Sequence, residues 1–527
     1  MKYDVIVIGS GISGMRAAIE AKELGANVVL ITKSSPAANN SFMAKGGINA
    51  AFGNMEDGDN IFNHIAETFK SSVDIGNEES IRIFCEQAPA AVRDLIGYGV
   101  QFSTLEDGRI AQRPFGGSKF KRTVYAADET GPAIMKALYD VIKNYEIDVI
   151  KNHMAINLLS RNNIISGVTL LDEESEKVVV CEGKSVILAS GGFASLYKNY
   201  TSNVKDATGD AIAMGLRAGL KAMNLEFVQF HPTGLEGTNF LLSEAARAEG
   251  GRLVDENGES FVDELNTRDF VTRAIFKEIQ KGNHVYLDLR DVPQEVINTK
   301  LIGIKKRVYT LKKLDPTCDL IPVTPVAHYT MGGIATDVIG RTTIQGLFIV
   351  GEAGDNGVNG ANRLGGNSLS QGAVFGKISA YEAIKFANKM KKYNGVDYYD
   401  ITKDIQWISH LQELAKHVDV NEIRNEIGRV MFEKIGIIRT ESELMEALEN
   451  FKAMEQSIKN GKSEKSCNVK SLLELVNALL VAKATAKSAL LREESRGSHF
   501  RIDFPEKDRK FKTNTLIALD EIDASKV

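Results

Sequence analysis

Cysteine is scarce in this 527-residue chain, and its placement excludes several kinds of redox site. None of the cysteines stands at the CxxC spacing of a local zinc or iron–sulfur site, and no CxxCH haem motif is present. The cysteines are Cys85, Cys181, Cys318 and Cys467. This usage is typical of a reducing compartment without disulfides. No metal site is expected, and electrons that travel through iron–sulfur clusters must use another chain.

Long apolar runs and basic runs are missing as well. No stretch of about 18 consecutive apolar residues is present, so we expect no direct insertion into a membrane. The first residues contain neither a charged leader nor an apolar signal segment. The formal net charge of −5, without a long basic run, argues against nucleic acid as a partner. We therefore expect a cytoplasmic protein, with any membrane association made through partner subunits.

The order of patterns along the chain predicts several domains, since 527 residues exceed one compact core. Residues 240–313 mix helices and short strands without the glycine-rich segments that precede them and resume at residues 331–376. Residues 400–491 have a charged, helical pattern, and residues 507–527 read as a polar tail. The expected division is 1–232 with 331–390 for a discontinuous Rossmann-like α/β domain, 233–330 for an inserted α+β capping domain, and 400–505 for a C-terminal helical domain.

The N-terminus has the pattern of a dinucleotide-binding unit. Residues 3–8 form an apolar strand, residues 9–14 read GSGISG, residues 15–24 have helical spacing, and residues 27–32 form a second strand. The glycines of this fingerprint are Gly9, Gly11 and Gly14. Gly9 allows a tight turn, Gly11 allows the backbone to approach the pyrophosphate closely, and Gly14 allows the helix to pack on the strand.

The end of the second strand departs from the common fingerprint. An acidic residue usually binds the ribose there, but this chain has Thr32 and Lys33, which makes NAD a less favoured ligand. Thr32 can bond a ribose hydroxyl, and Lys33 can approach a phosphate. Exposure of Lys33 to solvent is the alternative.

Four short segments in the second half each contain one residue suited to binding a carboxylate. They are His231 in FHPTG, Arg268 in NTRD, His328 in AHYTMGG and Arg363 in GANRLGGNSL. Arginine offers a planar fork of donors and keeps its charge, so two arginines and two histidines could bind a small dianion. The alternatives are core or surface histidines, and a surface ion pair between Arg268 and Asp269.

Ten ordered motifs give the chain a clear resemblance to a known family. They include AKGGINAAF, RPFGGSKFKRTVYAADETG, LASGGFASLY, TGDAIAMGLRAG, LEFVQFHPTG, GLFIVGEAG and REESRGSHFR, in addition to those quoted above. The chain resembles the flavoprotein subunits of fumarate reductase and succinate dehydrogenase, with L-aspartate oxidase as a relative. The match runs from about residue 2 to residue 503.

The resemblance implies FAD as the cofactor. By position, the resemblance places a set of residues near FAD. They are Gly9, Gly11, Gly14, Thr32, Lys33, Ser41, Gly46, Gly47, Asp210, Glu352, Arg363, Ser368 and Leu369. Glu352 could accept hydrogen bonds from ribityl hydroxyls, and Ser368 could bond the flavin edge. Asp210 is also placed to be a helix N-cap in TGDA.

The position of the covalent flavin link departs from many relatives. Those relatives attach FAD through a histidine just before the paired glycines, where this chain has Asn40, and no histidine occurs from Met1 to Asn63. FAD is therefore expected to bind non-covalently. In this family the absence of the link favours fumarate reduction or aspartate oxidation over succinate oxidation. Asn359 also replaces the histidine that commonly precedes GANR.

The resemblance also implies roles for the substrate site. His231, Ser243, His328 and Arg363 would bind the carboxylates, and Arg268 would donate a proton to the substrate. Glu244 and Arg247 would return a proton to Arg268, and their i, i+3 spacing places them on one face if the segment is helical.

Phe115 separates the two nearest activities. Aspartate oxidases have a glutamate at this place in the Gly-Gly loop, which would pair with the substrate ammonium group. A phenylalanine cannot neutralise a buried ammonium group, so Phe115 favours fumarate or succinate. Fumarate reduction is the predicted activity, L-aspartate oxidation is the alternative, and a non-catalytic flavin-binding scaffold is the third reading. The predicted partners are a small dicarboxylate substrate and an iron–sulfur protein that supplies electrons.

Overall fold

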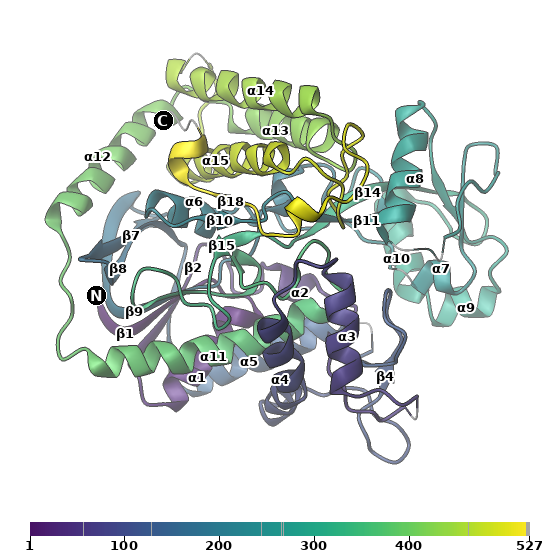
Figure 1. The fold of residues 1–527 in the computed structure, drawn as a ribbon, viewed down its shortest axis with the longest axis horizontal. Coiled ribbons are helices and arrows are strands. Elements are labelled where there is room, and N and C mark those ends of the chain that lie inside the picture. Colours follow the sequence, from purple (N-terminus) through teal and green to yellow (C-terminus); the bar gives the residue numbers. More distant parts are fainter. Residues whose placement is uncertain are drawn as a thin grey trace.

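The computed structural model describes residues 1–55, 57–127, 129–243, 245–264, 266, 268–461 and 463–522. It confirms a mixed α/β fold with an additional helical region (Figure 1). Within the described residues, no helix is long and apolar enough to cross a bilayer. In the same part of the chain, no group of three or more His, Cys, Asp or Glu side chains is arranged to hold a metal ion.

A seven-stranded sheet forms the centre of the molecule, with the order β6-β2-β1-β9-β8-β7 and β16 paired to β9. Its strands are β1 (Lys2–Ile8), β2 (Val28–Thr32), β6 (Asp148–Lys151), β7 (His153–Arg161), β8 (Ile164–Asp172), β9 (Lys177–Leu188) and β16 (Leu347–Ile349). β6, β2, β1, β9 and β16 are parallel neighbours, whereas β7, β8 and β9 form antiparallel hairpins. β16 comes from the second sequence segment, so this sheet joins strands that lie far apart in the sequence.

Helices cover both faces of this sheet. α1 (Ile12–Glu23), α5 (Thr130–Asn144) and α11 (Asn367–Lys389) pack together on one face, and α4 (Glu78–Gly97) lies against α11 (Figure 1). On the other side, α6 (Asp210–Arg217) packs against α15 (Val469–Leu491). The remaining elements near the site are α2 (Asn40–Met43), α3 (Ile61–Ser71) and a small sheet of β3 (Ile48–Asn49), β5 (Thr123–Val124) and β4 (Gln112–Arg113).

The inserted segment forms a lobe at one side of the molecule (Figure 1). Its antiparallel sheet has the order β11-β14-β13-β12, from β11 (Val228–Leu235), β14 (Ile321–Thr330), β13 (Tyr286–Asp288) and β12 (Arg252–Val254). Its helices are α7 (Ala245–Ala248), α8 (Arg268–Gln280), α9 (Gln294–Thr299) and α10 (Ile302–Lys312). The expected start of this segment at residue 233 falls inside β11, which therefore connects the lobe to the α/β unit.

The C-terminal region is helical and begins at α12 (Tyr398–Ala415). It continues with α13 (Val420–Lys434), α14 (Glu441–Asn460) and α15. Side chains at all four N-caps accept backbone N–H bonds, which fixes where each helix begins. The capping residues are Asp397, Asp419, Thr440 and Asn468.

The hydrophobic cores show which regions are joined. Ile6 and Val186 of the central sheet share one core with Leu473 and Val481 of α15, so the helical region is packed onto the α/β unit. The inserted lobe has a core of its own, which includes Leu253, Ile275, Leu287 and Val308. This difference leaves the lobe as the more independent part of the fold.

The chain end corrects one expectation. Residues 507–527 were expected to form a polar tail, but β18 (Leu516–Ile517) pairs with β10 (Ala222–Met223) in a sheet with β15 (Gly333–Ala335) and β17 (Gly354–Asp355). Short 3₁₀ helices complete this region and the loops: Ala194–Leu196, Gly351–Ala353, Arg509–Phe511 and Leu519–Ile522. Ile517 is buried against the core, which anchors residues 507–522 to the rest of the fold despite their polar composition.

Candidate active site

The glycine fingerprint forms a tight turn between β1 and α1. Gly9 has φ +109°, and a Cβ atom there would lie 2.3 Å from the carbonyl oxygen of Ala189. A Cβ atom at Gly14 would lie 1.8 Å from the carbonyl oxygen of Gly9. α1 begins at Ile12, and its N-cap Gly11 has no side chain to bond the first N–H groups. These donors and the helix dipole suit a pyrophosphate.

Hydroxyl groups surround the same turn. Ser41 Oγ accepts a hydrogen bond from the Ile12 N–H at 3.1 Å, and Ser10 Oγ lies 3.1 Å from Thr32 Oγ1. Ser190 Oγ is buried and has no hydrogen-bond partner among the described residues. Buried polar atoms normally have partners, so an unsatisfied hydroxyl beside a glycine cradle fits a dinucleotide such as FAD.

Lys33 lies in a buried ion-pair network, which contradicts the alternative of a solvent-exposed side chain. Its ammonium group donates to Asp210 Oδ2 at 2.7 Å, to Thr208 Oγ1 at 2.9 Å and to Glu474 Oε1 at 2.9 Å. Its side chain is only 16% exposed, so it is not solvated. Burial alone would lower the pKa of Lys33, but the charges of Asp210 and Glu474 raise it. The ammonium group of Lys33 therefore makes three hydrogen bonds to the protein itself.

Asp210 stands one position later than expected in α6. The N-cap is Gly209, with φ +77°, and Asp210 is the first helical residue. Its carboxylate accepts from Asn477 at 2.9 Å and from Thr208 at 3.0 Å, in addition to Lys33. Asp210 therefore connects the α/β unit to α15 as well as lying at a helix N-terminus.

The paired glycines allow close packing of neighbouring segments. A Cβ atom at Gly46 would lie 2.6 Å from the Phe115 ring, and one at Gly47, which has φ +123°, would lie 2.6 Å from the carbonyl oxygen of Val124. Gly365 has the same relation to Phe115, also at 2.6 Å. Phe115 therefore fits between two glycine-rich loops, and larger residues there would displace it.

Glu352, Ser368 and Leu369 lie in the second α/β segment. Glu352 Oε1 accepts from the Thr330 N–H at 2.9 Å and from Thr330 Oγ1 at 3.0 Å. Removal from water raises the pKa of Glu352 to about 7. Ser368 and the buried Leu369 stand in the first turn of α11, which follows Gly366 with φ +85°.

The two predicted histidines face each other across the β11–β14 pair. The ring centroids of His231 and His328 are 5.9 Å apart, with an interplanar angle of 68°. His231 Nδ1 accepts from the Thr233 N–H at 3.3 Å, so its Nε2 carries the proton and can donate it. His328 Nδ1 lies 2.7 Å from Ser202 Oγ, which leaves Nε2 of this ring for a ligand.

Arg363 is a buried cation whose hydrogen bonding is incomplete. One terminal nitrogen donates to Gln229 Oε1 at 2.9 Å, and the guanidinium carbon lies 4.3 Å from the centre of the Tyr329 ring. Its Nε atom is buried without a partner among the described residues. Burial lowers the pKa of Arg363 to about 10, and the nearby charge of Arg268 acts in the same direction. An anion bound here would accept a hydrogen bond from Nε and would raise the pKa of Arg363 again.

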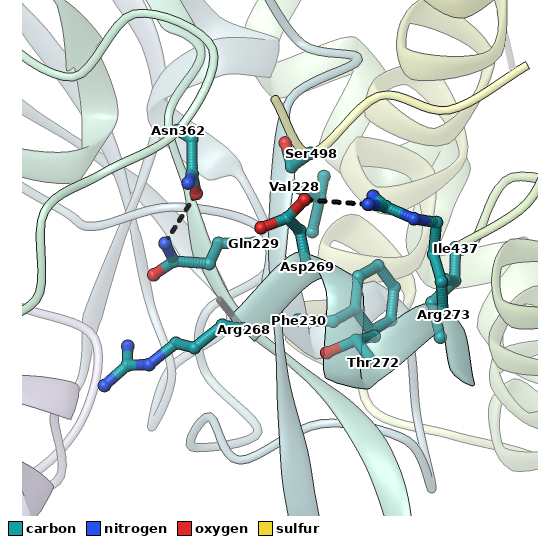
Figure 2. Close-up of a pocket in the computed structure, with 10 residues that line it drawn as sticks. All are labelled: Val228, Gln229, Phe230, Arg268, Asp269, Thr272, Arg273, Asn362, Ile437 and Ser498. Atoms are coloured by element: carbon teal, nitrogen blue, oxygen red, sulfur yellow. Dashed lines mark hydrogen bonds and ion pairs between the residues drawn. The ribbon is translucent and has the colours of Figure 1, made fainter. Parts of the chain in front are cut away.

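Arg268 begins α8 and lies above Phe115. Its guanidinium carbon is 5.6 Å from the centre of the Phe115 ring. Figure 2 shows the guanidinium pointing away from Asp269, whose carboxylate pairs with Arg273 at 2.9 Å. The cavity drawn there lies between α8, β11 and the C-terminal segment at Ser498, and neither histidine lines it. Arg268 is among the residues that line this cavity, although its guanidinium extends away from the Asp269–Arg273 pair.

The electrostatics place the predicted cations around His231. Burial lowers the pKa of His231 well below its usual value, and the charges of Arg268, Arg247, His328 and Arg363 lower it further. Arg247 is almost fully buried in α7 and donates to the carbonyl oxygen of Glu264 at 2.6 Å. The structure thus brings together five of the seven residues predicted for the substrate site.

The remaining two are less defined. Ser243 lies at the surface just before α7, where its carbonyl oxygen accepts from the Ala246 N–H at 3.1 Å. The prediction for Glu244 lies outside the described residues. Its proposed helical relation to Arg247 therefore stays a prediction.

Comparison with known proteins agrees with this geometry. Residues 4–369 match the FAD binding domain family, and residues 424–526 match the fumarate reductase flavoprotein C-terminal family. The chain is 36% identical over 562 residues to the succinate dehydrogenase flavoprotein subunit of Rickettsia bellii, covering 99% of this chain and 93% of the relative. The chain belongs to the succinate dehydrogenase/fumarate reductase flavoprotein family. It is a FAD-dependent oxidoreductase of this type.

Other relatives show how widely this family fold is shared. An uncharacterised FAD-dependent oxidoreductase of Methanocaldococcus jannaschii is 38% identical over 530 residues, covering 98% of this chain and 96% of that protein. A chain of a mutated quinol fumarate reductase of E. coli superimposes with a TM-score of 0.90 at 31% identity, covering 98% of this chain and 94% of that one. These likenesses confirm the family predicted from the motifs.

Three residues of this family member escaped the sequence reasoning. Gln229 binds Arg363, Tyr329 lies under the Arg363 guanidinium, and Ser202 bonds His328. Gln229 stands two positions before His231 on one strand, so the period of two along β11 was a usable signal. Ser202 lies 126 residues from His328, and no local pattern connects them.

Proposed function

We propose that the protein reduces fumarate to succinate. The observation that supports this most directly is the buried, incompletely paired Arg363, which lies with Arg268 and Arg247 around two histidines of lowered pKa. A small dianion would satisfy this cluster. Phe115 beside Arg268 offers no charge to pair with an amine, which favours a plain dicarboxylate over L-aspartate.

The chain's own groups would hold the two carboxylates. His231 donates from Nε2, His328 presents Nε2 on the facing strand, and Arg363 supplies the charged donor, with Ser243 as a further ligand. The same donors stabilise the charge that develops on a carboxylate during reduction. FAD, which the Gly9–Gly14 turn and Ser41 would hold, would supply a hydride to the substrate when bound.

Arg268 would donate the proton that the other alkene carbon requires. Hydride and proton together convert fumarate to succinate, so the atoms and charge balance. Because arginine has a pKa above about 12, proton transfer must accompany hydride arrival rather than precede it. Arg247, buried close enough to influence His231, would return the proton with Glu244.

FAD is proposed to bind without a covalent link. Asn40 stands at the position of the linking histidine, and both ends of its side-chain amide are bonded to the loop at Asn203 and Val204. Unfolding the holoprotein in guanidinium chloride and passing it through a desalting column should release all flavin absorbance from the protein fraction. Flavin that stays with the unfolded chain would contradict this.

The inserted lobe is proposed to act as a cap over the substrate. It contains α8 with Arg268 and has its own hydrophobic core, so it can rotate as a unit. The proposed domains remain 1–232 with 331–390, 233–330 and 400–505. Closure would exclude water and complete the site.

An iron–sulfur protein is the proposed electron source. The Rickettsia relative is named a flavoprotein subunit, and the E. coli relative a quinol fumarate reductase. The four scattered cysteines give this chain no motif of its own for a cluster. We also propose a cytoplasmic location, with membrane association only through partner subunits.

The test is an anaerobic half-reaction. The holoprotein is reduced chemically, fumarate is added, and reoxidation of the flavin is followed by absorbance. Oxidised protein is mixed with L-aspartate in parallel. Rapid reoxidation by fumarate without flavin reduction by L-aspartate supports the proposal, whereas reduction by L-aspartate would identify an aspartate oxidase. Absence of both reactions would favour a flavin-binding scaffold.

A further inference from the structure

The loop at residues 200–204 runs along the end of β14 and holds His328 in place. The Ser202 N–H donates to the carbonyl oxygen of Ala327 at 3.0 Å, and Ser202 Oγ lies 2.7 Å from His328 Nδ1. Asn203 Nδ2 donates to the carbonyl oxygen of His328 at 2.9 Å. The backbone and the ring of His328 are thus both bonded to this loop.

Asn40 holds the same loop from the other side. Its Nδ2 donates to Asn203 Oδ1, and its Oδ1 accepts from the Val204 N–H at 3.0 Å. Asn203 is only 5% exposed, so its amide has few alternative partners. With its oxygen bound to Asn40, the Asn203 amide must present its nitrogen to His328. The orientation of the Asn40 amide therefore determines how the Asn203 amide bonds to His328.

We propose that Asn40 is a positioning residue for dicarboxylate binding, which acts through Asn203 and the 200–204 loop to orient His328. Relatives with a histidine here use the position to hold the flavin, whereas this chain uses it to hold a substrate ligand. The inference rests on the proposed dicarboxylate function. It assigns Asn40 no contact with the substrate.

The first test measures succinate binding to the oxidised holoprotein by titration calorimetry. Asn40→Ala should raise the Kd about fivefold to tenfold, the effect expected for loss of one or two hydrogen bonds. The FAD content, measured by absorbance, should stay equal to that of the unmodified protein. Asn394→Ala is the matched control, because Asn394 also fastens a loop, through bonds to Arg161, Ile164 and Ser166, away from the site. It should leave the Kd unchanged.

A second variant separates orientation from simple loss of packing. Asn40→Asp keeps the acceptor for the Val204 N–H but removes the donor to Asn203 Oδ1. The Asn203 amide should then turn its nitrogen toward Asp and its oxygen toward the His328 carbonyl, which breaks that bond. Asn40→Asp should therefore weaken succinate binding as Asn40→Ala does. Binding equal to that of the unmodified protein would overturn the proposal.

The decisive test is a pair of double-variant cycles. In a His328→Ala background, Asn40→Ala should have no further effect on the Kd, because the residue it positions is gone. In a His231→Ala background its effect should persist. An equal effect of Asn40→Ala in both backgrounds would show a general structural role and contradict the proposal. If the unmodified protein binds no succinate, the proposed function itself fails, which is a separate result.

Discussion

Two regions of the molecule bury positive charge, and they differ in how that charge is balanced. Lys33 is surrounded by the carboxylates of Asp210 and Glu474, whose charges raise its pKa despite burial. Arg363 is more deeply buried, at 5% exposed, but has an unbonded Nε, and its pKa is lowered to about 10. A balanced cation holds segments of the fold together, whereas an unbalanced one is stabilised only when an anion binds.

The strongest test of the unbalanced region is Arg268→Ala. It should lower the rate of flavin reoxidation by fumarate by about 10²-fold to 10⁴-fold, the range for loss of a general acid. FAD should stay bound, because Arg268 lies on the inserted lobe. The measurement is anaerobic stopped-flow absorbance on holoprotein with equal flavin content.

Arg252→Ala is the matched control for that variant. Arg252 belongs to the same lobe, but its side chain is 47% exposed and pairs with Asp291 at 2.9 Å. Its removal should change the rate less than about twofold, as expected for a surface ion pair. Near-normal activity of Arg268→Ala would show that another group donates the proton.

Replacing each buried cation by methionine tests the comparison directly. Lys33→Met leaves the buried carboxylate of Asp210 without a cationic partner and leaves Glu474 with Arg424 alone, so it should destabilise the protein by about 3 kcal/mol or more. Arg363→Met should change stability by less than about 1 kcal/mol, since its burial is already unfavourable. Thermal unfolding of the holoproteins without dicarboxylate measures both.

The two variants should differ in the opposite way in how much added succinate raises their unfolding temperature. Succinate should raise the unfolding temperature of Lys33→Met as much as that of the unmodified protein, because ligand binding stabilises the folded state. Arg363→Met should lose most of this rise. Equal ligand responses of the two variants would remove the distinction between the two regions.

The sequence predicted the parts of these regions that depend on local patterns. The β1–Gly9–Gly14–α1 unit and the buried strand β16 follow from apolar runs and glycine spacing. His231 and His328 stand in distinctive motifs on the paired strands β11 and β14. Such features need only neighbouring residues, so one sequence is sufficient to find them.

Contacts between distant residues could not be predicted in this way. Glu474 lies 441 residues after Lys33, so nothing near Lys33 showed whether it meets a phosphate, solvent or a carboxylate. The same holds for β18, a two-residue apolar strand within a polar segment, whose pairing with β10 no local pattern shows. The sequence showed only that Asn40 replaces the histidine that links the flavin in many relatives. Its bond to Asn203 could not be predicted, because Asn203 is 163 residues away.

Phe115→Glu would place a carboxylate beside Arg268 and neutralise part of the cationic region. Fumarate and succinate should then bind about tenfold or more weakly, because their carboxylates would be repelled. L-Aspartate, which has an ammonium group, should become a better ligand and begin to reduce the flavin. The neutral control is Phe115→Gln, which should show the loss of packing without the gain with L-aspartate. Unchanged selectivity of Phe115→Glu would show that this position does not contact the substrate.

The smallest expected effect is that of pH on succinate affinity. The pKa values of His231 and His328 are lowered by burial and by the neighbouring arginines, so both rings stay neutral well below their usual value near 6.5. A histidine with an ordinary pKa would gain charge as the pH falls through 6.5 and would bind a dianion more tightly. Because these rings gain no charge in that window, the Kd for succinate should stay within about twofold between pH 8 and pH 6. Calorimetric titrations at intervals of half a pH unit provide the measurement. A marked increase in affinity toward pH 6 would mean that a histidine becomes charged in the site, and that the arginines alone do not supply the positive charge that recognises the dicarboxylate.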